Sequence, residues 1–412
     1  MTAEVDDHDR LSVGGCDVIA LAQEHGTPLF VYDEAHLRAR CREATAAFGD
    51  GAVYAAKAFL CRAMAALVAE EGMSLDVATG GELHVALAAG FPPERLVLHG
   101  NNKSEAELGY ALESGVGRVV ADSFDELDRI ENLVSRGAPR PRVLLRVTPG
   151  VEAHTHEYVM TGQDDSKFGF GLASGAAAEA AERAWASPAM DLVGLHAHIG
   201  SNIFLLASFT KAVERLAGFV KVLDLPELSL GGGLGVAYVE GEEAPSITEW
   251  ATGLRAACAA AGIGARLSVE PGRAIVAGAA VTLYRVGTVK PLPGIRTYVA
   301  VDGGMSDNPR PVLYGSGYEA FLPRATTAAR DLRVTVVGKH CESGDVLVRD
   351  ARVPVDLAVG DILATPVTGA YGHSMGSNYN KVPRPPVLFV ADGRARVVVR
   401  RETLDDLLRF DE

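Results

Sequence analysis

The sequence predicts an α/β fold in which a (β/α)8 TIM barrel is followed by an antiparallel β-barrel or sandwich domain. Between about residues 50 and 275, eight short apolar runs alternate with alanine-rich helical stretches. Most of these runs are apolar throughout, as expected for parallel strands that are buried on both faces. After Tyr284 helical stretches become rare, and β-branched runs are separated by Gly, Pro and Asp turns. An open doubly wound sheet is the alternative fold.

The expected elements follow one another along the chain. Barrel strands are predicted at residues 53–56, 75–77, 96–99, 118–121, 143–147, 192–196, 228–230 and 267–270. Helices are predicted at residues 61–71, 81–89, 105–114 and 123–135, among others. Strands of the second domain are predicted at residues 297–301, 333–337, 345–348, 387–390 and 395–400. We assign residues 28–284 to the barrel and residues 1–27 plus 285–412 to the β-rich domain, because the first 27 residues do not fit the barrel count.

Composition limits the class of protein. The chain of 412 residues is long enough for two domains and a large core. Its formal net charge of −14 argues against a nucleic-acid or anionic-membrane partner. The acid-rich start lacks the features of a secretory signal, and no run approaches the ~20 apolar residues of a membrane span. Five dispersed cysteines indicate reduced thiols, so we expect a cytoplasmic protein.

Unusual polar residues stand where the predicted strands end, which is where a (β/α)8 barrel builds its active site. Lys57 follows the first strand closely, Asp76 lies in the second and His99 closes the third. His198 follows the sixth strand, and Glu-Pro-Gly-Arg at 270–273 closes the eighth. We therefore expect these side chains to meet at one mouth of the barrel.

Two glycine-rich turns, after strands seven and eight, predict a phosphate site. The first contains Gly231, Gly232 and Gly233, and the second contains Gly272 beside Arg273. Backbone N–H groups approach an anion closely where no side chain intervenes. A tight turn is the alternative interpretation of an isolated glycine run, but the position after these two strands favours an anion site.

Lys57 indicates the nature of the phosphorylated group. A lysine at the end of an apolar strand is costly to bury as an ammonium unless it is paired or chemically used. Lysine forms Schiff bases with carbonyl cofactors. A buried lysine and a phosphate site in one barrel mouth therefore predict pyridoxal 5'-phosphate. The alternative is a Lys57 that reaches out of the barrel or pairs with Asp76.

Glu270 and His198 fit the ring of that cofactor. A carboxylate against the ring nitrogen holds the proton there, which makes the ring a better electron acceptor. His198 is expected to stack on the ring face, although a hydrogen-bonded core histidine is the alternative. His-x-His at 196–198 also resembles half of a metal site, for which His99 would be a third ligand. We expect no metal.

Together these motifs resemble the alanine-racemase-like fold type (fold type III) of pyridoxal-phosphate enzymes, and within it the diaminopimelate decarboxylases of the group IV decarboxylases. The likeness runs from residue 26 to residue 403. It includes Tyr-Ala-Ala-Lys-Ala at 54–58, Asp-Val-Ala-Thr-Gly-Gly-Glu-Leu at 76–83, His-Gly-Asn-Asn-Lys at 99–103, Ser-Lys-Phe-Gly at 166–169, His-Ile-Gly-Ser at 198–201, Gly-Gly-Gly-Leu-Gly at 231–235, Glu-Pro-Gly-Arg at 270–273, Asp-Gly-Gly-Met at 302–305, Cys-Glu-Ser-Gly-Asp at 341–345 and Gly-Ala-Tyr at 369–371. Glu-Ala-His-Thr-His-Glu at 152–157 is especially similar to actinobacterial members.

The resemblance implies decarboxylation of the D-configured centre of meso-2,6-diaminopimelate, which yields L-lysine and carbon dioxide in the last step of lysine biosynthesis. It implies that Lys57 holds the cofactor as a Schiff base, that His198 stacks on the ring and that Glu270 faces the pyridine nitrogen. The other implied cofactor residues are Asp76, Ser201, Gly231, Gly232, Gly233 and Gly272, together with Arg273 and Tyr371, which also reach the substrate.

The resemblance also assigns residues of the second domain. Arg310 and Tyr314 match residues that grip the distal end of the substrate, and Glu342 matches a carboxylate that binds its ammonium. Cys341 matches the proton donor, a role that needs a thiol pKa near the working pH. Cys341 and Glu342 reach the site of the other subunit in the family, which implies a homodimer. An inert Cys341, and an Arg310 engaged in a surface or interface salt bridge, are the alternatives.

Departures from the family pattern keep other functions open. Asn202 stands where Gln is common, and Gly376 stands where Ser is usual. A paralogue acting on a related or carrier-bound amino acid in secondary metabolism is therefore one alternative. A non-catalytic pyridoxal-phosphate-binding protein is less favoured, because it has no chemical need for Lys57, Cys341 and Glu342 together. An amino-acid racemase would carry a tyrosine where Cys341 stands.

Overall fold

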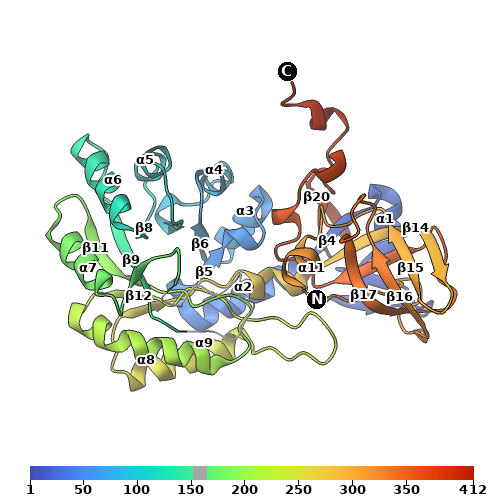
Figure 1. Ribbon diagram of the computed structural model, residues 1–412, viewed down its shortest axis with the longest axis horizontal. Helices are drawn as coiled ribbons and strands as arrows, with labels where there is room; N and C mark the ends of the chain where they lie inside the picture. Colours follow the sequence, from blue (N-terminus) through green and yellow to red (C-terminus); the bar gives the residue numbers. More distant parts are fainter. Residues whose placement is uncertain (152–164) are drawn as a thin grey trace. The chain divides into compact units, whose positions relative to one another are not determined.

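The computed structural model describes residues 1–151 and 165–412, drawn as a ribbon in Figure 1. The chain divides into two compact units. The barrel unit comprises Arg40–Val236 and Glu243–Ala274, and the β unit comprises Met1–Ala39, Ala237–Glu242 and Ile275–Glu412. The motif at 152–157 lies outside the described residues. The sequence predicts slightly different limits, with the barrel at residues 28–284 and the β-rich domain at residues 1–27 plus 285–412. Those limits remain a prediction.

The barrel unit contains eight parallel strands that form a nearly closed barrel. They are β5 (Val53–Ala55), β6 (Ser74–Val77), β7 (Leu96–Leu98), β8 (Arg118–Ala121), β9 (Arg142–Thr148), β11 (Asp191–His196), β12 (Glu227–Ser229) and β13 (Arg266–Ser268). They pair in that order, and a parallel bridge between Ala52 and Val269 joins the two ends of the series. A short strand, β10 (Phe170–Gly171), pairs with β9. This confirms the predicted (β/α)8 barrel and rules out an open doubly wound sheet.

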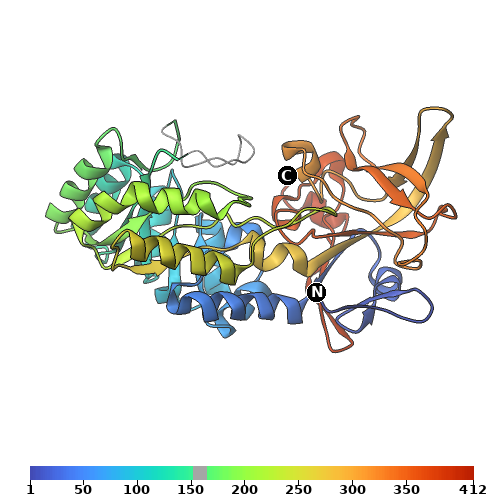
Figure 2. The ribbon, with the colours of Figure 1, turned by 90° about the horizontal axis from the view of Figure 1, so that it is seen from below.

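Helices cover the outside of these strands (Figures 1 and 2). They are α3 (Arg62–Glu70), α4 (Gly80–Ala88), α5 (Glu105–Glu113), α6 (Phe124–Ser135), α7 (Ala176–Ala186), α8 (Leu206–Leu223) and α9 (Ile247–Ala260). Several begin where a hydroxyl side chain accepts a hydrogen bond from the first turn, as Ser104 and Ser246 do in full capping boxes. The chain passes between the two units within α2 (Glu34–Phe48), on either side of Ala237–Glu242 and within α10 (Arg273–Val276).

The β unit is built on a mixed sheet. Its strands are β4 (Leu29–Asp33), β14 (Ala280–Leu292), β15 (Arg296–Val301), β16 (Leu332–Val337), β17 (Val346–Val353), β18 (Ile362–Pro366), β19 (Val387–Ala391) and β20 (Arg394–Val399). Most pairs are antiparallel, whereas β15 with β16 and β4 with β19 are parallel. The short strands β1 (Ala3–Val5), β2 (Leu11–Val13) and β3 (Cys16–Asp17) and the helix α1 (Val18–His25) belong to the same unit, beside its orange and red strands in Figure 2.

One buried apolar cluster holds the β unit together. Residues of β2 and α1 pack in it with residues of β4, β14, β18 and β19. The N-terminal segment therefore shares a core with the C-terminal strands, as predicted. Among residues 1–151 and 165–412, no helix combines the length and the apolar character that crossing a membrane requires.

Candidate active site

The glycine turn after β12 has a backbone that only glycine accommodates. Gly231 and Gly233 have φ angles of +65° and +107°. A Cβ on Gly232 would lie 2.2 Å from the carbonyl oxygen of Glu270, and one on Gly233 would lie 2.2 Å from that of Gly200. The turn is thus pressed against the neighbouring loops with its amides free of side chains, which is the form of cradle that an anion such as a phosphate group needs.

His198 lies directly beside this turn. The backbone N–H of Gly232 donates to His198 Nδ1 over 3.2 Å, so this nitrogen carries no proton. Burial holds the pKa of His198 well below its ordinary value, and the nearby Lys57 lowers it further. His198 is therefore a neutral ring whose orientation is fixed by the hydrogen bond to Nδ1, which suits a residue that stacks on a cofactor.

Lys57 follows β5 in the one-turn helix η2 (Ala56–Ala58). Its side chain is exposed, which corrects the prediction of a buried lysine. The physical reason is position, since Lys57 lies past the last strand residue, where the apolar run has ended. Its charge lowers the pKa of both Asp76 and His198, so the ammonium lies at the same end of the barrel as these two groups.

Arg273 and Ser201 are brought together at this end of the barrel. Arg273 Nη2 donates to Ser201 Oγ over 3.0 Å, and the arginine is buried. Gly272, the residue before Arg273, would place a Cβ 3.0 Å from the Cβ atoms of Ala55 and Ala58, on either side of Lys57 in sequence. The strand-eight turn therefore packs against the Lys57 segment.

Glu270 is buried at the centre of a polar cluster inside the barrel. Ser229 Oγ donates to Glu270 Oε1 over 2.8 Å, and His196 Nε2 lies 3.1 Å from Glu270 Oε2. Burial acts to raise the pKa of Glu270, but His196 and His99 outweigh it and hold that pKa well below its ordinary value. Glu270 is therefore an anion. Asp76 differs, since burial raises its pKa in spite of the opposing effect of His99.

Arg146 is a buried charge of the barrel that the sequence reasoning missed. It lies in β9, with Nε 3.7 Å from Asp122 Oδ1. Its charge also acts on Asp76 and Glu270, each of which raises the pKa of the arginine against the effect of burial. The sequence does contain a signal for a buried functional charge, because this arginine interrupts an otherwise apolar strand at residues 143–147.

Three donors in this cluster meet the geometric requirement of a metal site. One ligand atom each of His99, His196 and Glu270 lies within 4.8 Å of the others. The set differs from the one considered from the sequence, because Glu270 takes the place of His198. Within this set His196 Nε2 lies 3.1 Å from Glu270 Oε2, and His99 Nε2 lies 3.4 Å from Glu270 Oε1.

In the β unit, Arg310 is a buried cation that two aromatic rings hold. It opens the helix α11 (Arg310–Tyr314), and its guanidinium lies 4.2 Å from the ring centre of Tyr238 and 5.5 Å from that of Tyr318. Among the described residues, no carboxylate lies within ion-pair distance of Arg310, and Nε has no hydrogen-bond partner. Tyr314 and Tyr371 are half-buried in the same unit. A buried arginine without a carboxylate is suited to bind one from a ligand.

Cys341 and Glu342 are exposed on a loop of the β unit. The backbone N–H of Cys341 donates to Asn380 Oδ1 over 3.2 Å, and His340 Nδ1 lies 3.2 Å from the same oxygen. The backbone N–H of His340 donates to Asp345 Oδ2 over 2.9 Å. These hydrogen bonds hold the backbone of the loop in place, while the thiol of Cys341 and the carboxylate of Glu342 are exposed to solvent.

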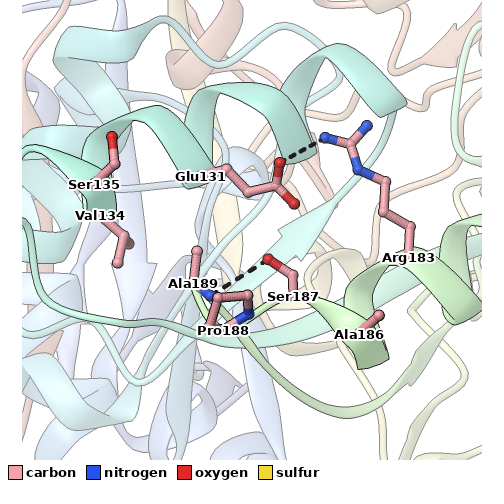
Figure 3. Close-up of a pocket in the computed structure, with 8 residues that line it drawn as sticks. All are labelled: Glu131, Val134, Ser135, Arg183, Ala186, Ser187, Pro188 and Ala189. Carbon is pink, nitrogen blue, oxygen red and sulfur yellow. Dashed lines mark hydrogen bonds and ion pairs between the residues drawn. The ribbon is translucent and has the colours of Figure 1, made fainter.

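A surface pocket of about 620 Å³ lies elsewhere on the barrel unit (Figure 3). Its lining comes from the C-terminal halves of α6 and α7 and from the chain after α7, namely Glu131, Val134, Ser135, Arg183, Ala186, Ser187, Pro188 and Ala189. These helices lead into β9 and β11, so the pocket adjoins the ends where strands begin. It is therefore separate from the face that carries Lys57 and Glu270.

Comparisons with known proteins extend over both units. A family model for the pyridoxal-binding domain of pyridoxal-dependent decarboxylases matches residues 34–277. The chain is 48% identical to the diaminopimelate decarboxylase of Mycobacterium bovis, covering 97% of this chain and 94% of that protein. It is 46% identical to that of Bacillus subtilis, covering 100% and 97%. The crystal structure of the diaminopimelate decarboxylase from M. jannaschii in complex with L-lysine matches with a TM-score of 0.92 at 31% identity, covering 100% and 98%.

Proposed function

Because this chain belongs to the diaminopimelate decarboxylase family of pyridoxal-dependent enzymes, we propose that it converts meso-2,6-diaminopimelate into L-lysine and carbon dioxide, the last step of lysine biosynthesis. The observation that carries the proposal is the meeting of Lys57, the glycine turn and Glu270 at one end of the barrel. L-lysine, the product of this reaction, is bound in the crystal structure of the related M. jannaschii enzyme.

Pyridoxal 5'-phosphate fits the groups at this end of the barrel. When bound, it supplies an electron sink for the carbanion that remains after carbon dioxide leaves. We assign Lys57 to hold its aldehyde carbon and the glycine turn, with Ser201 and Arg273, to bind its phosphate. Glu270 would accept a hydrogen bond from the protonated ring nitrogen, and the neutral ring of His198 would pack against the cofactor ring.

We assign recognition of the substrate's distal end to the β unit. Arg310 pairs with the distal carboxylate, which gives the buried guanidinium the anion that it lacks among the described residues. Glu342 accepts from the distal ammonium, and Tyr314 and Tyr371 complete the contacts. An amino acid without the second carboxylate leaves Arg310 unpaired, so such a substrate is disfavoured.

Cys341 is the residue that we assign to deliver a proton to the α-carbon after carbon dioxide has left. Its thiol is exposed in the single chain. We place Cys341 and Glu342 in the active site of a second copy of the chain, so the proposed enzyme is a homodimer with shared sites. We further propose that it acts in the cytoplasm.

A substrate panel tests the proposed reaction. Release of carbon dioxide is measured with meso-diaminopimelate, lysine, ornithine and arginine side by side, in the presence of pyridoxal phosphate. We expect release from meso-diaminopimelate and little from the other three. Lys57→Ala should lose both the release and the visible absorption that borohydride fixes, whereas the exposed Lys211→Ala should keep both. Release from another amino acid alone would refute the substrate, and full activity of Lys57→Ala would refute the site.

A further inference from the structure

Three side chains surround the carboxylate of Glu270 from inside the barrel, and the cofactor assignment above gives none of them a role. Ser229 Oγ donates to Glu270 Oε1 over 2.8 Å, and His99 Nε2 lies 3.4 Å from the same oxygen. His196 Nε2 lies 3.1 Å from Glu270 Oε2. Both carboxylate oxygens are therefore occupied, which fixes the plane of the group as well as its position.

The whole cluster is shut away from solvent. Glu270 and His99 are each 6% exposed, Ser229 is 2% exposed and His196 is 1% exposed. Water therefore cannot replace a lost partner, and each of these contacts must be made within the protein. The three partners come from the loop after β7, from the end of β11 and from the end of β12, so neighbouring strands deliver them to one carboxylate.

The two histidines have different charge states. His99 also lies 4.0 Å from Asp76, so although burial acts to lower its pKa, the two carboxylates raise that pKa above its ordinary value. Burial lowers the pKa of His196 to about 4, and His99 and Arg146 add to this effect. The rings meet edge to face, with centres 4.9 Å apart. The two carboxylates thus favour the charged form of His99, whereas burial favours the neutral form of His196, whose Nε2 faces the anionic carboxylate of Glu270.

The loop that carries His99 is anchored by a buried lysine. Lys103 Nζ donates to the carbonyl oxygens of Gly100 and Val120 over 2.6 and 2.8 Å and lies 2.7 Å from Glu126. The chain immediately after His99 is therefore tied to β8, which leaves His99 little freedom to leave Glu270.

We infer that His99, His196 and Ser229 are positioning residues that keep Glu270 an oriented anion and so leave the shared proton on the cofactor's ring nitrogen. The reason is competition between two bases for one proton. A carboxylate that contacts Ser229 and His196 and has His99 beside it is the weaker base, so the proton stays on the ring. The inference rests on the proposed function, since it concerns the group that Glu270 faces.

The test uses the holoenzyme prepared with pyridoxal phosphate that is isotopically labelled at the ring nitrogen. The NMR chemical shift of this nitrogen reports whether it carries the proton. We expect the protonated value in the wild type and a move toward the unprotonated value in His196→Leu. His196→Gln, which retains an N–H donor, should restore most of the shift, and Ser229→Ala should give an intermediate one. The exposed His84→Gln on α4 is the matched control and should behave as the wild type.

The kinetic constants kcat and KM distinguish a positioning role of His196 from a general loss of active-site structure. The ring proton matters chiefly when charge develops in the transition state, so His196→Leu should lower kcat by about tenfold or more with a smaller effect on KM. An unchanged nitrogen shift in folded His196→Leu would overturn the inference. If His196→Leu does not fold, Ser229→Ala decides the question by the same shift. A wild type that binds no pyridoxal phosphate would refute the proposed function itself.

Discussion

Arg310 is the buried residue to which we assign recognition of the substrate's second carboxylate. It is 4% exposed, its guanidinium lies against the rings of Tyr238 and Tyr318, and its Nη1 donates a hydrogen bond to the hydroxyl of Tyr318. These contacts stabilise a cation only partly, because neither the aromatic rings nor the Tyr318 hydroxyl carries a net charge. A carboxylate from a substrate would complete the set, whereas an ammonium or an apolar group would not.

Arg310→Leu should therefore weaken selection for a second carboxylate more than it weakens catalysis in general. We expect kcat/KM for meso-diaminopimelate to fall by about a hundredfold, which corresponds to about 3 kcal/mol for a lost buried charge pair. The ratio of activity on meso-diaminopimelate to that on lysine should shrink by a similar factor in a side-by-side assay. Arg349→Leu removes an exposed arginine of the same unit and should leave this ratio unchanged. A retained ratio in Arg310→Leu would show that another residue reads the carboxylate.

The barrel residues named by motif lie where the sequence predicts them, at the carboxyl ends of the barrel strands, because that position follows from fold topology alone. The partners of Glu270 were harder to predict. His196 and Ser229 stand within or beside apolar runs, where a histidine or a serine also fits as a hydrogen-bonded core residue. The exposure of Lys57 could not be predicted, since it depends on where β5 ends, and strand ends follow from pairing rather than from composition.

At the scale of elements, the barrel strands were predictable because parallel strands buried on both faces are apolar runs of distinctive length. β10 (Phe170–Gly171) and β18 (Ile362–Pro366) were not predicted. β10 has only two residues, and β18 contains an alanine and ends in a proline, both of which are rare in strands. Between elements, one buried ion pair stands out. It joins Lys103, in the loop that precedes α5, to Glu126 in the first turn of α6.

Lys103→Met should destabilise the barrel unit strongly. The pair is almost completely buried, so removal of the lysine leaves an uncompensated Glu126, at a cost of about 3–5 kcal/mol. The double variant Lys103→Met/Glu126→Leu should recover most of the loss, because it removes both charges. Arg136→Met breaks a solvent-exposed pair with Glu105 and should cost less than about 1 kcal/mol. Shifts of the urea unfolding midpoint measure all three, and equal shifts for the two single variants would contradict the argument.

At the scale of the whole molecule, the argument for the proposed homodimer is that the residue assigned as proton donor is exposed to solvent in the single chain. Cys341 and Glu342 lie on a loop that Asn380 and Asp345 fix in place, yet both side chains are exposed in the single chain. A proton donor works best where water is excluded, since water would otherwise compete for the carbanion. A second copy of the chain provides such an environment if each active site combines the barrel unit of one subunit with this loop of the other.

Mixed dimers test this arrangement directly. Lys57→Ala and Cys341→Ala are each expected to be nearly inactive, because one lacks the cofactor amine and the other lacks the proton donor. When the two are unfolded and refolded together, random pairing makes about half of the dimers mixed, and each mixed dimer has one site with both residues intact. Activity should therefore return to about a quarter of the wild-type value. Lys57→Ala refolded with the double variant Lys57→Ala/Cys341→Ala should regain none, because no chain then carries Lys57. If the first mixture also stays inactive while sedimentation shows dimers, Cys341 serves the site of its own subunit, and the shared-site dimer is wrong.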